Sequence, residues 1–129
     1  MKHLVGILIS IIILVQIIGC SESQQFVAVP SNINRATVPK DTIEVIAKDF
    51  EFIPDTIRVY EGTLVTLKLK SIEGTHGFDL GAFGIDERLD ENVTKIVEFY
   101  AAKKGEYGIR CSHFCGIGHL GMTAKLIIE

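Results

Sequence analysis

The chain has 129 residues, enough for one domain of modest size and a short targeting segment. Its 13 Lys and Arg side chains and 16 Asp and Glu side chains give a formal net charge of -3, and the acidic residues are spread along the chain. This pattern argues against nucleic-acid binding, which needs a basic surface, and predicts a mildly acidic surface that suits a basic protein partner.

The N-terminal segment has the pattern of an export signal. A positive start at Lys2 precedes an apolar run from Leu4 to Ile18, shorter than the roughly 20 residues that a helix needs to cross a bilayer. The run ends Ile17-Ile18-Gly19-Cys20, which resembles the cleavage box of bacterial lipoproteins, where the cysteine becomes the new N-terminus and carries lipid. We expect residues 1–20 to be a signal and lipid anchor attached at Cys20, with an uncleaved signal anchor as the alternative. Both predict an extracytoplasmic, membrane-anchored protein, in the periplasm or on the outer face of the cytoplasmic membrane.

The rest of the chain alternates between polar linker and short strand patterns. Residues 21–41 are expected to be a linker, because Ser, Gln, Asn and Pro are frequent and no periodicity is sustained. From residue 42 onward, apolar residues recur at every second position, which is the period of a half-buried strand. The strands are expected around residues 42–52, 57–60, 64–70, 93–100, 107–111 and 124–128. The acidic stretch 86–91 is expected to be a solvated loop.

This succession of short strands and turns predicts the architecture of the domain. No segment supports a long amphipathic helix. We therefore expect residues 42–129 to form one all-β domain, an antiparallel sandwich or barrel with Greek-key connections.

The segment between the last two expected strands concentrates metal-binding side chains within twelve residues. These side chains are Cys111, His113, Cys115, His119 and Met122. Soft sulfur combined with imidazole is the ligand set that selects copper. His76 follows another expected strand, and a sandwich can bring its loop to the same pole. The sequence therefore predicts a copper site of two Cys, two His and one Met.

The spacing Cys-x3-Cys-x3-His-x2-Met, with His76-Gly77-Phe78 upstream, resembles the dinuclear copper domain of subunit II of haem-copper cytochrome oxidases. The likeness is to the short bacterial type of the ba3-class enzymes, and it implies a cupredoxin-like Greek-key β-sandwich or barrel. It also implies that Cys111 and Cys115 bridge two copper ions, while His76 and His119 bind one copper each.

The same resemblance implies two weak ligands, Met122 for one copper and the backbone carbonyl of His113 for the other. Three departures from the family stand out. Position 113 is commonly Glu or Gln in the family and is His here, and the chain has no Trp to act as an aromatic entry point for electrons. One short expected signal stands where the family usually has long transmembrane helices, which favours a free-standing relative over an oxidase subunit.

The resemblance implies one-electron transfer, either as subunit II of a haem-copper terminal oxidase or as a donor to one. Electrons would come from a cytochrome c-like donor and pass to the oxidase's catalytic subunit, and this chain alone would catalyse no reaction. The alternative is a membrane-anchored protein that stores copper or delivers it during oxidase assembly.

Three other sites remain as alternatives. A zinc site of Cys111, Cys115, His113 and His119 would leave Met122 and His76 without a role. A redox disulfide favours Cys-x-x-Cys rather than the wider spacing seen here. A mononuclear blue-copper site needs one Cys only, so the second Cys argues against it.

The segment from Cys111 to Met122, called the metal loop below, contains three glycines, and three aromatic residues lie in it or are expected near it. The aromatic residues, which are expected either to form an apolar collar that excludes water or to lie in the core, are Phe78, Phe83 and Phe114. The glycines, which are expected to let the loop curl around a metal without side-chain clashes, are Gly116, Gly118 and Gly121.

Overall fold

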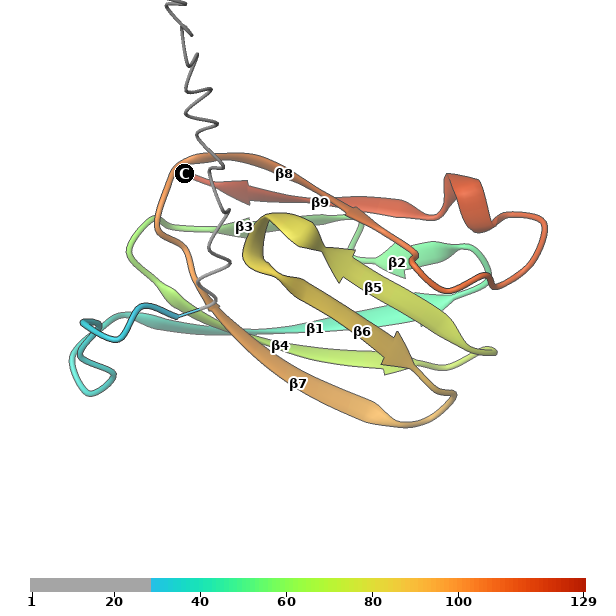
Figure 1. Cartoon of the computed structure of the whole chain (residues 1–129), viewed down its shortest axis with the longest axis horizontal. Coiled ribbons are helices and arrows are strands. Elements are labelled where there is room, and N and C mark those ends of the chain that lie inside the picture. The colour runs from blue at the N-terminus through green and yellow to red at the C-terminus, as the bar shows by residue number, and fades with distance from the viewer. Residues whose placement is uncertain (1–28) are drawn as a thin grey trace, which may run out of the picture.

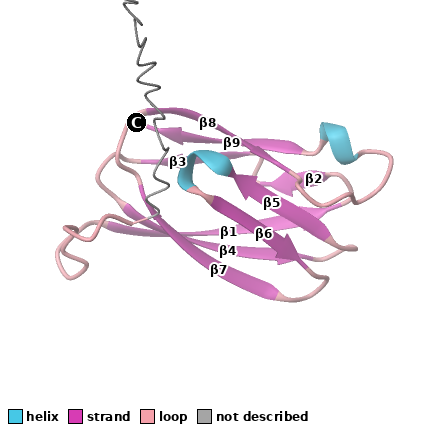
Figure 2. Cartoon of the chain, viewed as in Figure 1, coloured by secondary structure: helices cyan, strands magenta, loops and turns pink. Residues whose placement is uncertain are grey.

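The computed structural model describes residues 29–129, so the expected anchor segment 1–20 and Cys20 lie outside the described residues. Residues 29–39 are irregular, and the first strand begins at Lys40. The described chain contains nine β-strands and two short 3₁₀ turns (Figures 1 and 2). None of its helical segments has the length and apolar character needed to span a membrane. The all-β fold class is confirmed.

The strands form two sheets that pack face to face (Figure 1). The four-stranded sheet has the order β2-β1-β4-β7, and the five-stranded sheet has the order β3-β9-β8-β5-β6. The strand bounds are β1 Lys40–Lys48, β2 Glu51–Ile53, β3 Thr56–Val59, β4 Leu64–Ser71, β5 His76–Leu80, β6 Ile85–Leu89, β7 Thr94–Tyr100, β8 Gly105–Arg110 and β9 Thr123–Ile128. The 3₁₀ turns are η1 Gly81–Phe83 and η2 His119–Gly121.

Two strand pairs are parallel, so the expectation of a purely antiparallel sandwich is wrong at these places. β1 runs parallel to β4, and β3 runs parallel to β9. The chain moves from the first sheet to the second between β2 and β3, and returns at β4. Such crossings allow strands to meet in parallel, and the alternation of apolar residues does not report strand direction.

The core lies between the sheets and follows the alternation in the sequence. On β4, Val65, Leu67 and Leu69 are fully buried, whereas Lys68 is exposed. The inner face of the other sheet contributes residues such as Leu126, which is also fully buried. The residues at every second position that were expected to face inward are the ones that form the core. Their buried apolar area is the main source of stability for such a domain.

The sequence pattern missed the β5–β6 hairpin. β6 covers most of the stretch that was expected to be a solvated loop, and its Ile85 and Leu89 are buried. Glu87 occupies the inward position between them and interrupts the apolar alternation, which explains the wrong expectation. His76 is accordingly the first residue of a strand and not a loop residue.

The strand expected around residues 42–52 is divided by a turn at Asp49 and Phe50. Phe50 has a φ of 87°, an uncommon value for a residue other than glycine, so it cannot continue the ladder. The β1–β2 turn, the start of β5 and the β8–β9 loop lie at one end of the sandwich, and the C-terminus lies at the other (Figure 1). All the elements that carry expected metal ligands therefore meet at one pole.

Candidate metal centre

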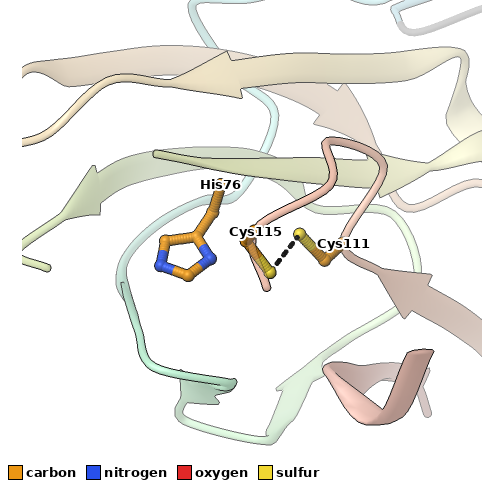
Figure 3. A group of neighbouring side chains, drawn as sticks. All are labelled: His76, Cys111 and Cys115. Atoms are coloured by element: carbon orange, nitrogen blue, oxygen red, sulfur yellow. Dashed lines mark hydrogen bonds between the residues drawn. The ribbon is translucent and has the colours of Figure 1, made fainter. Parts of the chain in front are cut away.

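Three donor side chains meet where β5 and β8 lie side by side. His76 opens β5, and Cys111 directly follows β8, its neighbour in the sheet. Cys115 lies four residues further along the β8–β9 loop. The ligand atoms of His76, Cys111 and Cys115 all lie within 4.8 Å of one another. The two sulfur atoms face each other at 3.6 Å, with the His76 ring beside them (Figure 3).

The 3₁₀ turn η2 brings two more donors to Cys115. Side chains three residues apart lie on the same side of a 3₁₀ helix, and His119 and Met122 have this spacing. The Cys115 Sγ atom lies 3.7 Å from His119 Nδ1 and 4.0 Å from Met122 Sδ. Met122 is fully buried, and its carbonyl accepts a 3.0 Å hydrogen bond from the Cys111 backbone N–H. The two ends of the metal loop are therefore tied together.

Position 113 contributes its backbone rather than its ring to this cluster. The Cys111 thiol donates a hydrogen bond of 3.1 Å to the His113 carbonyl, and the His113 side chain is partly exposed. The structure thus gathers five side chains and one carbonyl of the expected set. The zinc alternative needs the His113 ring, whereas His76 is the imidazole grouped with the two thiols.

The close packing of β5 against the metal loop explains why a glycine, Gly77, follows His76. Its N–H donates a 3.3 Å hydrogen bond to the Cys111 sulfur. A Cβ at this position would lie 2.8 Å from the Ser112 backbone nitrogen and still closer to the Ser112 hydroxyl and the His113 backbone nitrogen. Only a residue without a side chain lets β5 approach the metal loop so closely.

The His76 ring is oriented by a backbone carbonyl. Its Nε2 atom lies 2.7 Å from the Glu73 carbonyl oxygen, which can only accept, so Nε2 carries the proton. Nδ1 then has a free lone pair, is buried, and has no hydrogen-bond partner among residues 29–129. The buried Ser71 hydroxyl also bonds to this turn, through the Gly74 carbonyl at 2.7 Å.

A buried nitrogen without a hydrogen-bond partner lowers the stability of the fold, so its presence calls for an explanation such as metal binding. Nδ1 of His76 lies beside two thiols, and a backbone carbonyl fixes its tautomer, which is the arrangement typical of a metal-ligating histidine. Two sulfurs, a thioether and two imidazoles also match the preference of copper for soft donors. The residues present therefore fit a copper site.

The protonation of Cys115 links metal binding to proton release. Burial and the neighbouring Cys111 thiol raise the pKa of Cys115 to about 11. A pKa this high keeps the Cys115 thiol protonated at physiological pH in the absence of a bound cation. A metal ion that binds there must displace this proton.

Phe78, Phe83 and Phe114 do not form an apolar collar around the site. Phe78 and Phe83 are buried core residues, which was the alternative expectation. Phe114 is 76% exposed, so it does not close the site. The aromatic ring that covers the loop is Phe50, which sequence reasoning assigned to a strand; the polar Asp49 beside it was the available signal of a turn.

Comparisons with known proteins identify the family and the fold. The family described as "Cupredoxin-like domain" matches residues 10–128. Cytochrome c oxidase subunit 2 of Thermus thermophilus is 28% identical over 88 residues, which cover 68% of this chain and 65% of that protein. The chain therefore spans less than two thirds of the length of this relative.

A second relative shares a shorter stretch. Nitrous-oxide reductase of Cupriavidus necator is 36% identical over 70 residues, covering 54% of this chain and 11% of the enzyme. Among solved structures, the periplasmic domain of subunit II of cytochrome oxidase from Bradyrhizobium japonicum superposes with a TM-score of 0.64. That match has 18% identity and covers 68% of this chain and 83% of that domain, so it supports the fold.

Proposed function

The chain belongs to the cupredoxin-like domain family, and from this premise we propose that it transfers single electrons through a dinuclear copper centre. In this proposal Cys111 and Cys115 would bridge two copper ions, and His76 and His119 would bind one each. Met122 and the His113 carbonyl would be the weak ligands. Two coppers held in this way would supply one-electron redox chemistry, with the charge shared over both metals.

The observation that carries the proposal is the pairing of the two sulfurs. Cys111 and Cys115 lie 3.6 Å apart, and both belong to the same cluster with His76. A mononuclear blue-copper site uses one cysteine, so it leaves a second thiol at the site without a role. Support also comes from the relative named cytochrome c oxidase subunit 2.

The protein's own contribution is to hold the ligands still. His76 and Cys111 are both held by strands that are neighbours in one sheet, because His76 is the first residue of β5 and Cys111 directly follows β8. The Cys111 N–H to Met122 carbonyl bond closes the loop, and the Glu73 carbonyl holds the His76 ring. Ligands held in place by these backbone hydrogen bonds would need little movement when the redox state changes, and this favours fast electron transfer.

The loop also offers a contact surface for a partner. Phe114, Ile117 and Leu120 are all largely exposed, and the Phe114 ring lies 5.6 Å from that of the ligand His119. Exposed apolar residues of this kind are typical of a contact surface between proteins. We propose a cytochrome c-like donor and a haem-copper oxidase catalytic subunit as partners, with the chain anchored outside the cytoplasm through Cys20.

Copper content and spin resonance test the proposal. Copper-loaded protein, cleared of excess metal, should hold about two coppers per chain. Its partly oxidised form should show hyperfine coupling to two equivalent coppers. Cys111→Ser and Cys115→Ser should each abolish this pattern, with no further loss in the double variant, because a hydroxyl cannot replace a bridging thiolate. Cys20→Ser is the matched control and should leave copper content and spectrum unchanged.

The alternatives give different results in the same experiments. One copper per chain, with the colour dependent on one cysteine, would show a blue-copper site. A preference for zinc without charge-transfer colour would show a zinc site. Rapid surrender of copper to a mild chelator, without reversible redox cycling, would favour copper storage or delivery. Full colour and copper content without Cys111 or Cys115 would overturn the proposal.

A further inference from the structure

The β1–β2 turn presents an aromatic ring to the metal loop. Phe50 has a φ of 87°, in the left-handed region that residues with side chains rarely adopt. Its N–H donates a 2.8 Å hydrogen bond to the Lys48 carbonyl, which keeps the turn tight. Such a backbone conformation persists only where the surrounding structure holds it, and it concentrates at functional sites.

The Phe50 ring lies along two glycines of the loop. A Cβ built at Gly116 would be 3.1 Å from Cε1 and Cζ at the outer end of the ring. A Cβ built at Gly118 would be 2.7 Å from the Phe50 Cβ and still closer to the ring atoms Cγ and Cδ2. The ring therefore covers the stretch between Cys115 and His119, two of the proposed ligands.

Gly118 is a glycine because of this ring and not because of its backbone. Its φ of -82° and ψ of 0° are accessible to any residue. Gly116 differs, since its φ of 134° favours glycine by itself. A Cβ added at Gly121 would meet no atom of the described chain within 4 Å, so this position tolerates a methyl group. Among these three glycines, only at Gly118 does the lack of a side chain report directly on Phe50.

The same turn is tied to the His76 side of the centre. The Asp49 N–H, directly before Phe50, donates a 3.3 Å hydrogen bond to the Glu73 carboxylate. The carbonyl of Glu73 accepts the bond from His76 Nε2. The β1–β2 turn therefore contacts both segments that carry ligands, one through the Phe50 ring and the other through Glu73.

We propose that Phe50 is a positioning residue of the metal centre, whose ring rests on Gly116 and Gly118 and holds the Cys115–His119 stretch closed. The ring limits the opening of the loop and the access of solvent to Cys115. The inference deepens the proposed function, since it assigns a residue to the same site. Its first test uses metal-free protein and does not depend on the number of coppers.

The experiment measures how fast a maleimide reagent labels Cys115 in the reduced, metal-free full chain at one pH, with the site of labelling located by peptide mass spectrometry. Phe50→Ala and Gly118→Ala should each speed labelling about tenfold or more, because Cys115 is half-buried and a loop that opens more often would expose its sulfur further. The double variant should be no faster than the faster single variant, since the methyl group at 118 has room once the ring is gone.

Matched variants separate this role from a general loss of structure. Gly121→Ala, in the same loop, should label at the wild-type rate, and Phe50→Tyr should restore most of the protection because it keeps the ring. In copper-loaded protein, Phe50→Ala and Gly118→Ala should release copper to a chelator faster by a similar factor. Thermal unfolding of each variant shows whether the sandwich remains folded.

Two results would overturn the inference. Wild-type labelling rates in both Phe50→Ala and Gly118→Ala would mean that the ring does not hold the loop. Additive acceleration in the double variant would mean that the two residues act separately. If copper content shows one metal per chain while the labelling pattern holds, the dinuclear proposal fails and the positioning role of Phe50 stands.

Discussion

Replacing Gly77 with alanine tests the close approach of β5 to the metal loop. The new methyl group would meet the Ser112 backbone nitrogen at 2.8 Å, and the Ser112 hydroxyl and His113 backbone nitrogen even closer. Overpacking of this kind costs ~1–3 kcal/mol, and the upper part of this range applies because backbone atoms block the methyl group. Loss of the hydrogen bond from the Gly77 N–H to the Cys111 sulfur would add ~0.5–1.5 kcal/mol to this destabilisation.

The reduced conformational freedom of the unfolded chain offsets part of this cost. A Gly to Ala change stabilises a compatible site by ~0.4–1 kcal/mol, so Gly77→Ala should lower the free energy of unfolding by roughly 2–3 kcal/mol. Gly108→Ala, in β8, is the matched control, because no atom of residues 29–129 lies within 4 Å of its added Cβ. It should be neutral or stabilising by ~0.4–1 kcal/mol.

Denaturant unfolding of the metal-free proteins, followed by circular dichroism, measures both values. Gly77→Ala should also bind copper more weakly, since the added group pushes His76 away from the two thiols. Equal unfolding free energies for Gly77→Ala and Gly108→Ala, within ~0.5 kcal/mol, would refute the argument that a close backbone contact requires this glycine.

Three further predictions concern other parts of the chain. Met122→Leu keeps side-chain volume, so copper should stay bound while the reduction potential, measured by voltammetry, rises through loss of a weak donor to the oxidised form; complete loss of copper would contradict a weak-ligand role. The Arg35 guanidinium, 2.7 Å from Glu98, lowers the pKa of that carboxyl below its usual value of 4.5. The stabilisation by this ion pair is present above the unfolded-state pKa of Glu98 and is lost as the pH falls through the lower folded-state pKa. In Glu98→Gln, the free energy of unfolding should therefore decline less steeply below pH 4.5 than in the wild type. An unchanged decline would argue against the ion pair. Metabolically labelled lipid should appear on the wild-type protein and be missing from Cys20→Ser; an unlabelled wild type that stays in the membrane would indicate an uncleaved anchor.

The sequence determined the composition of the candidate site and most of the strands. The spacing of Cys115, His119 and Met122 was enough to predict that they belong to one metal site, because a short segment between two strands keeps its side chains at one pole. The alternation along residues 64–70 predicted β4 and its inward face, since a period of two is a local property of the chain. These features depend on near neighbours in sequence.

Tertiary structure decided the features that depend on residues distant in sequence. The parallel pairing of β1 with β4 follows from chain crossings between sheets, and β6 forms although Glu87 interrupts its pattern. The free Nδ1 of His76 results from the Glu73 carbonyl, and the place of Phe50 over Gly118 results from a turn in another part of the chain. Which atom faces the site, and which ring covers it, are set by packing between segments, and local periodicity carries no information about such contacts.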